Sequence, residues 1–253
     1  MPTLDRNGLP LYYETEGSGP ALILAHGAGG NAGIWFNQIA HFSATHQVVS
    51  FDHRSFGRTP LPSEPISVHH FRDDVLALMD HLNIDRAHLV GQSMGGFTCL
   101  RTTLDVPERV LSLTLSATTG GMHNPEPTEA FKNLTTGGSV ADTMSAATKA
   151  NPQLMQLYAS IGNFNVNFDW ANLSTLLSRE DVVMMDDLKN VATPTLIIAG
   201  DEDPLFPEAL LSSYVPHFQN ASIEVVANSG HSPYFEQPEV FNQILASHLA
   251  AAE

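Results

Sequence analysis

The chain has 253 residues, of which 43% are hydrophobic and 15% charged, and this composition excludes a disordered protein and predicts one large α/β domain. Eleven basic and 27 acidic residues give a formal charge of −16, which disfavours binding to nucleic acid or to an anionic membrane surface. The one cysteine, Cys99, cannot form an internal disulfide, and neither a signal peptide nor a membrane-spanning run is recognisable. We expect a cytoplasmic protein that acts on a small molecule, as a monomer or a homodimer.

The first half of the chain alternates strand and helix patterns. Asn7-Gly8 favours a tight turn, so an antiparallel hairpin that includes residues 9–15 is expected to begin the sheet. The helical spacing of Phe71, Val75 and Leu78 predicts an amphipathic helix over 67–82. Continuous apolar runs are typical of parallel strands covered on both faces, and they occur at residues 21–25, 47–51, 87–90 and 110–117.

The alternation stops after the run at 110–117. From Gly120 to Asp187 the patterns are mainly helical, separated by Pro, Gly and Asn, and an ordinary crossover between parallel strands is far shorter. We interpret this region as a helical cap at 120–190, inserted over the carboxyl edge of a core formed by 1–119 and 191–253. Alternation then resumes, with strands expected at 194–200 and 222–226 and helices at 208–215 and 238–250.

The sequence Gly91-Gln92-Ser93-Met94-Gly95-Gly96 follows the run at 87–90 and leads into a helical segment. Its G-x-S-x-G pattern is typical of a sharp, strained turn that lifts a serine hydroxyl out of the sheet. A serine at this place can also serve only as a helix N-cap.

A nucleophilic serine needs a general base, and that base needs a partner that fixes its tautomer. His231 follows the last expected strand, and Asp203 follows the strand before it, so both side chains can reach the carboxyl edge of the sheet. Their order along the chain is Ser, Asp, His. Asp201, two residues away on the same loop, is the competing acid.

Together these motifs resemble the α/β-hydrolase superfamily of esterases, lactonases and C–C hydrolases, and the length and layout resemble those of 3-oxoadipate enol-lactonases. The resemblance covers essentially the whole chain. Besides the serine turn, it is carried by His26-Gly27-Ala28-Gly29-Gly30, Asp52-His53-Arg54-Ser55-Phe56-Gly57, Gly200-Asp201-Glu202-Asp203, and Gly230-His231 followed by Glu236-Gln237-Pro238.

The resemblance implies the α/β-hydrolase fold, with a mostly parallel eight-stranded sheet flanked by helices and a helical cap insertion. It implies that Ser93 attacks a carbonyl, His231 transfers the proton, and Asp203 orients His231. It also implies an oxyanion hole formed by the amides of Ala28 and Met94.

In the same family the residue equivalent to His26 shapes the oxyanion loop. Asp52 and Arg54 are expected to brace loops. Ser55 stands where the family commonly has glycine, so the conformation of that loop is in question.

A serine at the nucleophile position, where dehalogenase and epoxide-hydrolase relatives need a carboxylate, points to an acyl-enzyme. We expect hydrolysis of small to medium, uncharged esters, lactones included. The alternatives are C–C cleavage of vinylogous diketones and, further away, a cofactor-free oxygenase or a ligand sensor. The region 120–190 contains few basic residues to clamp a dicarboxylate, namely Lys132, Lys149, Arg179 and Lys189. The substrate is expected to contact apolar side chains, for which the candidates are Trp35, Met122, Phe131, Tyr158 and Phe206.

No cofactor or metal is expected. The chain has no P-loop, and the glycines at 27–30 lack the G-x-G-x-x-G spacing of a dinucleotide site. His69 and His70, as adjacent helical residues, point about 100° apart and have no matching ligand cluster in the sequence. Cys99 is expected to be a small core residue.

Overall fold

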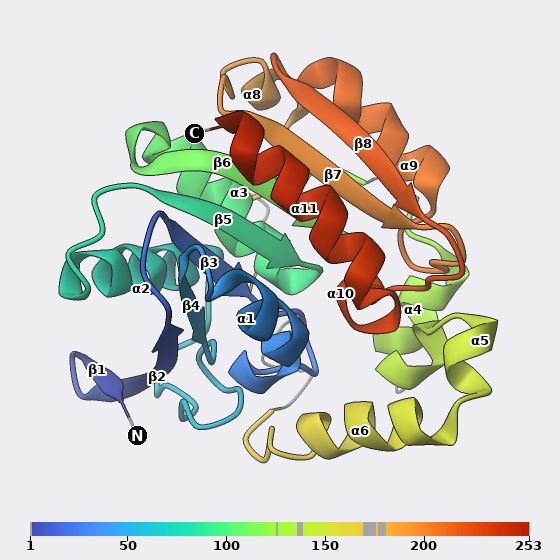
Figure 1. Ribbon diagram of the computed structural model, residues 1–253, viewed down its shortest axis with the longest axis horizontal. Helices are drawn as coiled ribbons and strands as arrows, with labels where there is room; N and C mark the ends of the chain where they lie inside the picture. The colour runs from blue at the N-terminus through green and yellow to red at the C-terminus, as the bar shows by residue number, and fades with distance from the viewer. Residues whose placement is uncertain (1, 125, 136–138, 169–175, 177–180, 253) are drawn as a thin grey trace.

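The computed structural model (Figure 1) describes residues 2–124, 126–135, 139–168, 176 and 181–252. Their strands form an eight-stranded sheet in the order β1-β2-β4-β3-β5-β6-β7-β8. β2 runs antiparallel to β1 and to β4, and the remaining neighbours are parallel, which confirms the expected mostly parallel sheet. The strands are β1 (Thr3–Arg6), β2 (Leu9–Glu16), β3 (Ala21–Ala25), β4 (Gln47–Phe51), β5 (Ala87–Gln92), β6 (Val110–Ser116), β7 (Thr195–Gly200) and β8 (Ala221–Val226).

The strand interiors explain why continuous apolar runs predicted the sheet so closely. Along β3, Ile23 packs into the core on one face, whereas Leu22 and Leu24 pack into the core on the other. Because successive side chains of a strand point to opposite faces, a strand covered on both sides must be apolar throughout. In the hairpin, Asn7 and Gly8 have φ angles of 57° and 88°, as the expected turn requires.

Helices cover both faces of the sheet. One face carries α2 (Val68–His81), α3 (Met94–Asp105) and α9 (Glu208–Tyr214), and the other carries α1 (Phe36–Phe42) and α11 (Pro238–Ala252), which crosses the front of the sheet in Figure 1. The helices predicted at 67–82, 208–215 and 238–250 are confirmed to within two residues. Short elements complete the core: η1 (Ala32–Trp35), η2 (Pro107–Arg109), η4 (Val215–His217) and α10 (Pro233–Glu236).

The residues between β6 and β7, 117–194, are called the inserted segment below. Figure 1 shows α4, α5 and α6 beyond the arrowheads of β5, β7 and β8, whereas α8 lies at the opposite end, where it contacts η4. Residues 169–175 and 177–180 of the expected cap, with Trp170 and Arg179, lie outside the described residues. The elements of the segment are α4 (Glu129–Thr135), η3 (Val140–Thr143), α5 (Ala146–Lys149), α6 (Pro152–Gly162) and α8 (Met185–Leu188).

The strand order places a topological switch point at β3. β3 lies between β4 and β5: the chain passes from β3 to β4 on one side and then from β4 across β3 to β5 on the other side. Open α/β sheets bind ligands outside the carboxyl ends of the strands at such a point. The loops that follow β3 and β5 are therefore the place to look for a site.

Candidate active site

Ser93 stands at the apex of a strained turn between β5 and α3. Its backbone has φ 50° and ψ −116°, a conformation that few non-glycine residues adopt, and its side chain is half-buried. The flanking glycines are required by close packing: a Cβ at Gly91 would lie 2.3 Å from the backbone oxygen of Gly95, and a Cβ at Gly95 would lie 2.0 Å from that of Ala25. The turn is held by the Ser93 amide, which donates to the Ser116 carbonyl at 3.0 Å.

His231 and Asp203 meet at the same edge of the sheet. The loop after β8 carries His231 and the loop after β7 carries Asp203, and His231 Nδ1 lies 3.0 Å from Asp203 Oδ2. Both side chains are buried. Asp203 Oδ1 accepts hydrogen bonds from the amides of Leu205 at 2.8 Å and Phe206 at 3.3 Å, which fixes the direction of the carboxylate.

Asp201, the competing acid, faces another way. It is exposed, and its Oδ1 accepts a hydrogen bond of 3.1 Å from the amide of Ser229. Asp201 therefore braces the backbone before His231, while Asp203 is the carboxylate that contacts the imidazole.

The backbone of His231 is held on two sides. Its carbonyl accepts a hydrogen bond of 2.9 Å from Gln92 Nε2, whose residue directly precedes Ser93. Its amide donates to the carbonyl of Thr143, in the inserted segment, at 3.0 Å. Gln92 thus joins the serine turn to the histidine loop, a link that the motif G-x-S-x-G does not specify.

The glycine-rich loop after β3 lies against the serine turn. A Cβ at Gly27 would stand 3.0 Å from Ser93 Cβ and 2.0 Å from Gln92 Oε1, so a larger residue there would displace the Gln92 side chain. Ala28 comes next and is half-buried. Met94 is the first residue of α3, and the amides of a first helical turn have no partner within the helix. The two amides expected to form an oxyanion hole therefore flank the turn that carries Ser93.

His26 shapes this loop and is not placed to act as a base. Its Nε2 accepts a hydrogen bond of 3.0 Å from the amide of His53, so Nδ1 carries the proton and donates to the Gly27 carbonyl at 2.8 Å. Burial lowers the pKa of His26 to about 4, which keeps the imidazole neutral at physiological pH.

The loop after β4 is braced as the sequence suggested. The buried Asp52 accepts hydrogen bonds from the amides of Ala32 at 2.6 Å and Arg58 at 2.7 Å, and Arg54 Nε donates to Asp74 Oδ2 at 2.7 Å. Ser55 adopts φ 77°, the left-handed conformation that explains a preference for glycine at this position.

The five apolar candidates divide into two groups. The Phe206 ring centroid lies 5.6 Å from that of His231, and Phe131 extends the row, 5.9 Å from Phe206. Tyr158 is buried against Phe235, with ring centroids 5.2 Å apart. Trp35 and Met122 are only 0% and 3% exposed and pack in the core clusters. Phe206 is therefore the candidate whose ring contacts the imidazole, and Phe131 packs against Phe206.

The remaining expectations concern metals and membranes. Among the described residues, no group of three or more His, Cys, Asp or Glu side chains is arranged to hold a metal ion. His69 Nε2 instead lies 2.8 Å from Asp181 Oδ1. Cys99 is buried, and burial raises the pKa of its thiol. None of the described helices is long and apolar enough to cross a membrane.

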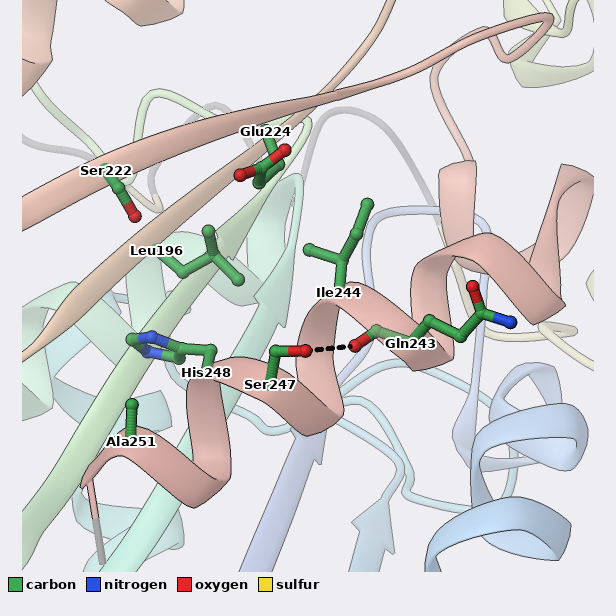
Figure 2. A pocket seen from close by; sticks show the side chains of 8 residues that line it. All are labelled: Leu196, Ser222, Glu224, Gln243, Ile244, Ser247, His248 and Ala251. Carbon is green, nitrogen blue, oxygen red and sulfur yellow. Dashed lines mark hydrogen bonds between the residues drawn. The ribbon is translucent and has the colours of Figure 1, made fainter.

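A separate depression of about 440 Å³ lies between β8 and α11. Figure 2 shows Ser222 and Glu224 on the strand side of it, and Ser247 and His248 on the helix. The Ser247 hydroxyl donates to the Gln243 carbonyl of its own helix at 3.0 Å. None of the loops that carry Ser93, Asp203 and His231 lines this depression, so it is not their site.

Comparison with known proteins gives consistent results. A family model described as the alpha/beta hydrolase fold matches residues 20–145. The chain is 29% identical over 259 residues to 3-oxoadipate enol-lactonase 2 of Acinetobacter baylyi, covering 95% of this chain and 93% of that protein. It is 29% identical over 261 residues to a candidate carbamate hydrolase, RutD, of Azorhizobium caulinodans, covering 97% of each.

Among solved structures, the chain is similar to Est816, which is described as an N-acyl homoserine lactone degrading enzyme. The TM-score is 0.84 at 26% identity, and the match covers 97% of this chain and 99% of that one.

Proposed function

We propose that this chain, which belongs to the α/β-hydrolase fold superfamily, is a serine hydrolase that cleaves carboxylic esters through an acyl-enzyme. The observation that carries the proposal is the 3.0 Å hydrogen bond between His231 and Asp203. The hydrogen bond joins two loops, and Gln92 ties the loop of His231 to the strained turn of Ser93. A buried imidazole–carboxylate pair whose loop is hydrogen-bonded to the residue before a half-buried, strained serine can serve as the base for that serine.

In the proposed reaction Ser93 Oγ attacks the carbonyl carbon while His231 Nε2 takes the hydroxyl proton. Asp203 accepts the hydrogen bond of His231 Nδ1–H and stabilises the imidazolium. The amides of Ala28 and Met94 donate to the oxygen that becomes negative. Collapse of the tetrahedral intermediate releases the alcohol with the proton from Nε2, and a water molecule, deprotonated by His231, then hydrolyses the acyl-enzyme.

We further propose that the substrate is uncharged and apolar near the reacting carbonyl. The aromatic row of Phe206 and Phe131 beside His231 supports this choice. Cations of the described part of the inserted segment are engaged elsewhere: exposed Lys132 pairs with Glu129 and exposed Lys189 with Asp186, each at 2.5 Å. Lys149 Nζ donates to the Asp142 carbonyl at 3.3 Å. A carboxylate on the substrate would need a cationic partner.

The inserted segment, from α4 to α6, is proposed to cap this site. Asn31 Nδ2 donates to the Ile161 carbonyl, and Asn165 Nδ2 donates to the Gly29 carbonyl, both at 2.8 Å. These bonds tie the end of α6 and the loop after it to the glycine-rich loop that carries Ala28. A cap in this position excludes water and contributes side chains to the acyl-binding surface.

The test is a panel of p-nitrophenyl esters of increasing acyl length, with the wild type and Ser93→Ala. We expect turnover by the wild type that rises from acetate to medium-length acyl groups, and a loss of about 10³-fold or more in kcat for Ser93→Ala. If no ester is turned over, or if Ser93→Ala is as active as the wild type, the proposal is wrong.

Lactones are the second candidate substrates, because a relative named as an enol-lactonase and a structure described as lactone-degrading are both similar to this chain. A lactone is a cyclic ester, so the same steps apply and the alcohol remains tethered to the acyl group. Adding γ-lactones, an N-acyl homoserine lactone, a carbamate and a vinylogous diketone to the panel ranks these carbonyl classes by kcat/KM. A vinylogous diketone cleaved faster than every ester would favour C–C hydrolysis instead.

A further inference from the structure

We propose that Glu236 is a positioning residue for His231, and that it couples the orientation of this base to the inserted segment. The inference rests on the function proposed above, in which His231 is the general base. It concerns a side chain that the proposed mechanism does not use.

Glu236 is a buried carboxylate that accepts three backbone hydrogen bonds. Its side chain is 6% exposed. Oε1 accepts from the amide of Gly230 at 3.0 Å and from the amide of Ser232 at 3.1 Å, and Oε2 accepts from the amide of Ser145 at 2.7 Å. Burial of a carboxylate is unfavourable unless its oxygens are hydrogen-bonded, and charge-assisted bonds of this kind are strong and directional.

Two of these amides flank His231 directly. The residues at 230 and 232 are the neighbours of the base, so one carboxylate oxygen holds the peptide on each side of it. The carbonyl of His231 is held by Gln92 and its Nδ1 by Asp203. Because the backbone on both sides of His231 is fixed, the imidazole keeps a constant orientation toward Asp203.

The third amide belongs to the inserted segment. The Ser145 amide donates to the same carboxylate, and the Thr143 carbonyl accepts from the His231 amide at 3.0 Å. A Cβ at Gly230 would lie 2.3 Å from the Thr143 oxygen, so the histidine loop packs directly on this backbone. A displacement of residues 143–145 would therefore act on the carboxylate that holds the base.

A glutamine at 236 cannot make all three bonds. Its side chain has one acceptor oxygen and an NH₂ group, and the NH₂ would face a backbone N–H donor on one side. Glu236→Gln therefore breaks either the bond to Ser145 or the pair around His231. The matched control is Glu239→Gln, which makes the same change of charge at an exposed position on the next helix.

Two readouts report on the base itself. One is the rate of covalent labelling by a fluorophosphonate, which needs an oriented base beside Ser93. The other is the downfield proton NMR signal of the imidazole Nδ1–H bonded to Asp203, which needs no reaction. With far-UV circular dichroism as the fold check, we expect Glu236→Gln to label about 10- to 100-fold more slowly and to shift or broaden this signal, whereas Glu239→Gln matches the wild type.

A second pair of variants tests the link without changing Glu236. Ser145 has φ −60° and Met144 before it has ψ 157°, so the backbone angles at 145 suit proline. Proline removes the donor, and its Cδ takes the place of the amide hydrogen and so displaces Glu236 Oε2. Ser145→Pro also removes the hydroxyl that caps α5 by accepting from the Thr148 amide, and Ser145→Ala removes that hydroxyl alone. We expect Ser145→Pro to slow labelling relative to Ser145→Ala and to shift the imidazole signal.

Wild-type labelling rates and unchanged signals in Glu236→Gln and Ser145→Pro would overturn the proposal. If Glu236→Gln does not fold, the comparison of Ser145→Pro with Ser145→Ala decides whether the proposal holds. If neither variant folds, the contact serves folding and the positioning role is wrong. A wild type that takes no label would refute the proposed hydrolase, and the NMR signal would still test the position of the imidazole.

Discussion

Asp203→Asn should abolish most of the activity by reversing the tautomer of His231. Oδ1 of Asp203 accepts from the amides of Leu205 and Phe206, so an asparagine keeps its oxygen at that place and turns its NH₂ toward His231. That NH₂ group is a hydrogen-bond donor, so Nδ1 can bond to it only as an acceptor, without a proton. The ring proton then moves to Nε2, where the base must accept the proton of Ser93.

The expected loss in kcat is about 10⁴-fold, equivalent to about 5.5 kcal/mol in activation free energy. Asp201→Asn is the matched control, because its single acceptor contact with the amide of Ser229 survives the change. Both variants are assayed with the best p-nitrophenyl ester at pH 7 to 8. Asp203→Asn with more than a tenth of wild-type kcat, or an equal loss in Asp201→Asn, would refute the assignment of the acid.

Three further predictions concern stability and the substrate. Because burial lowers the pKa of His26 from 6.5 to about 4, the unfolded state binds the proton first as the pH falls, and stability present above pH 6.5 is lost toward pH 4. In urea unfolding, this group should contribute about 2 to 3 kcal/mol less to the free energy of unfolding at pH 4.5 than at pH 7. The free energy of unfolding of His26→Gln should therefore fall less steeply with decreasing pH than that of the wild type, and equal slopes for the two proteins would contradict the prediction. Gly57→Ala should lower the free energy of unfolding by about 2 kcal/mol or more, because its Cβ would lie 2.2 Å from Asp52 Oδ2 and the backbone φ is 52°. An unchanged Tm of the variant would contradict this prediction. Phe131→Ala should raise KM about 5- to 30-fold for octanoyl esters and leave acetyl esters unchanged, and a uniform effect would place Phe131 outside the acyl-binding surface.

The strands were predictable because a strand that is buried on both faces appears in the sequence as a continuous apolar run. Runs such as that of β3 are apolar throughout, and their ends coincide with the observed strands to within two residues. The 3-10 turn and short helix at 32–42 were not predicted, because a single turn of 3-10 helix followed by seven helical residues is too short to show the hydrophobic period of a helix. The short helices of the inserted segment were recognisable as helical but not as separate elements for the same reason.

Some features of the candidate site were predictable from the sequence and others were not. Ser93 and its glycines were predictable because the strained turn restricts residue type, and the observed φ of 50° shows that strain. In the sequence only the family resemblance preferred Asp203 to Asp201, whereas the direction of each carboxylate depends on backbone amides in the folded chain. The contacts of Glu236 were not foreseen, because hydrogen bonds to backbone amides place no requirement on the residues that donate them.

The most direct test of the central claim is the site of covalent modification by a fluorophosphonate. Intact-mass and peptide mass spectrometry should find one adduct per chain, on Ser93, and none on Ser93→Ala, because only a serine with a base in reach displaces fluoride at neutral pH. An unmodified Ser93 in folded wild-type protein, or an adduct that persists in Ser93→Ala, would contradict the claim that Ser93 is the nucleophile.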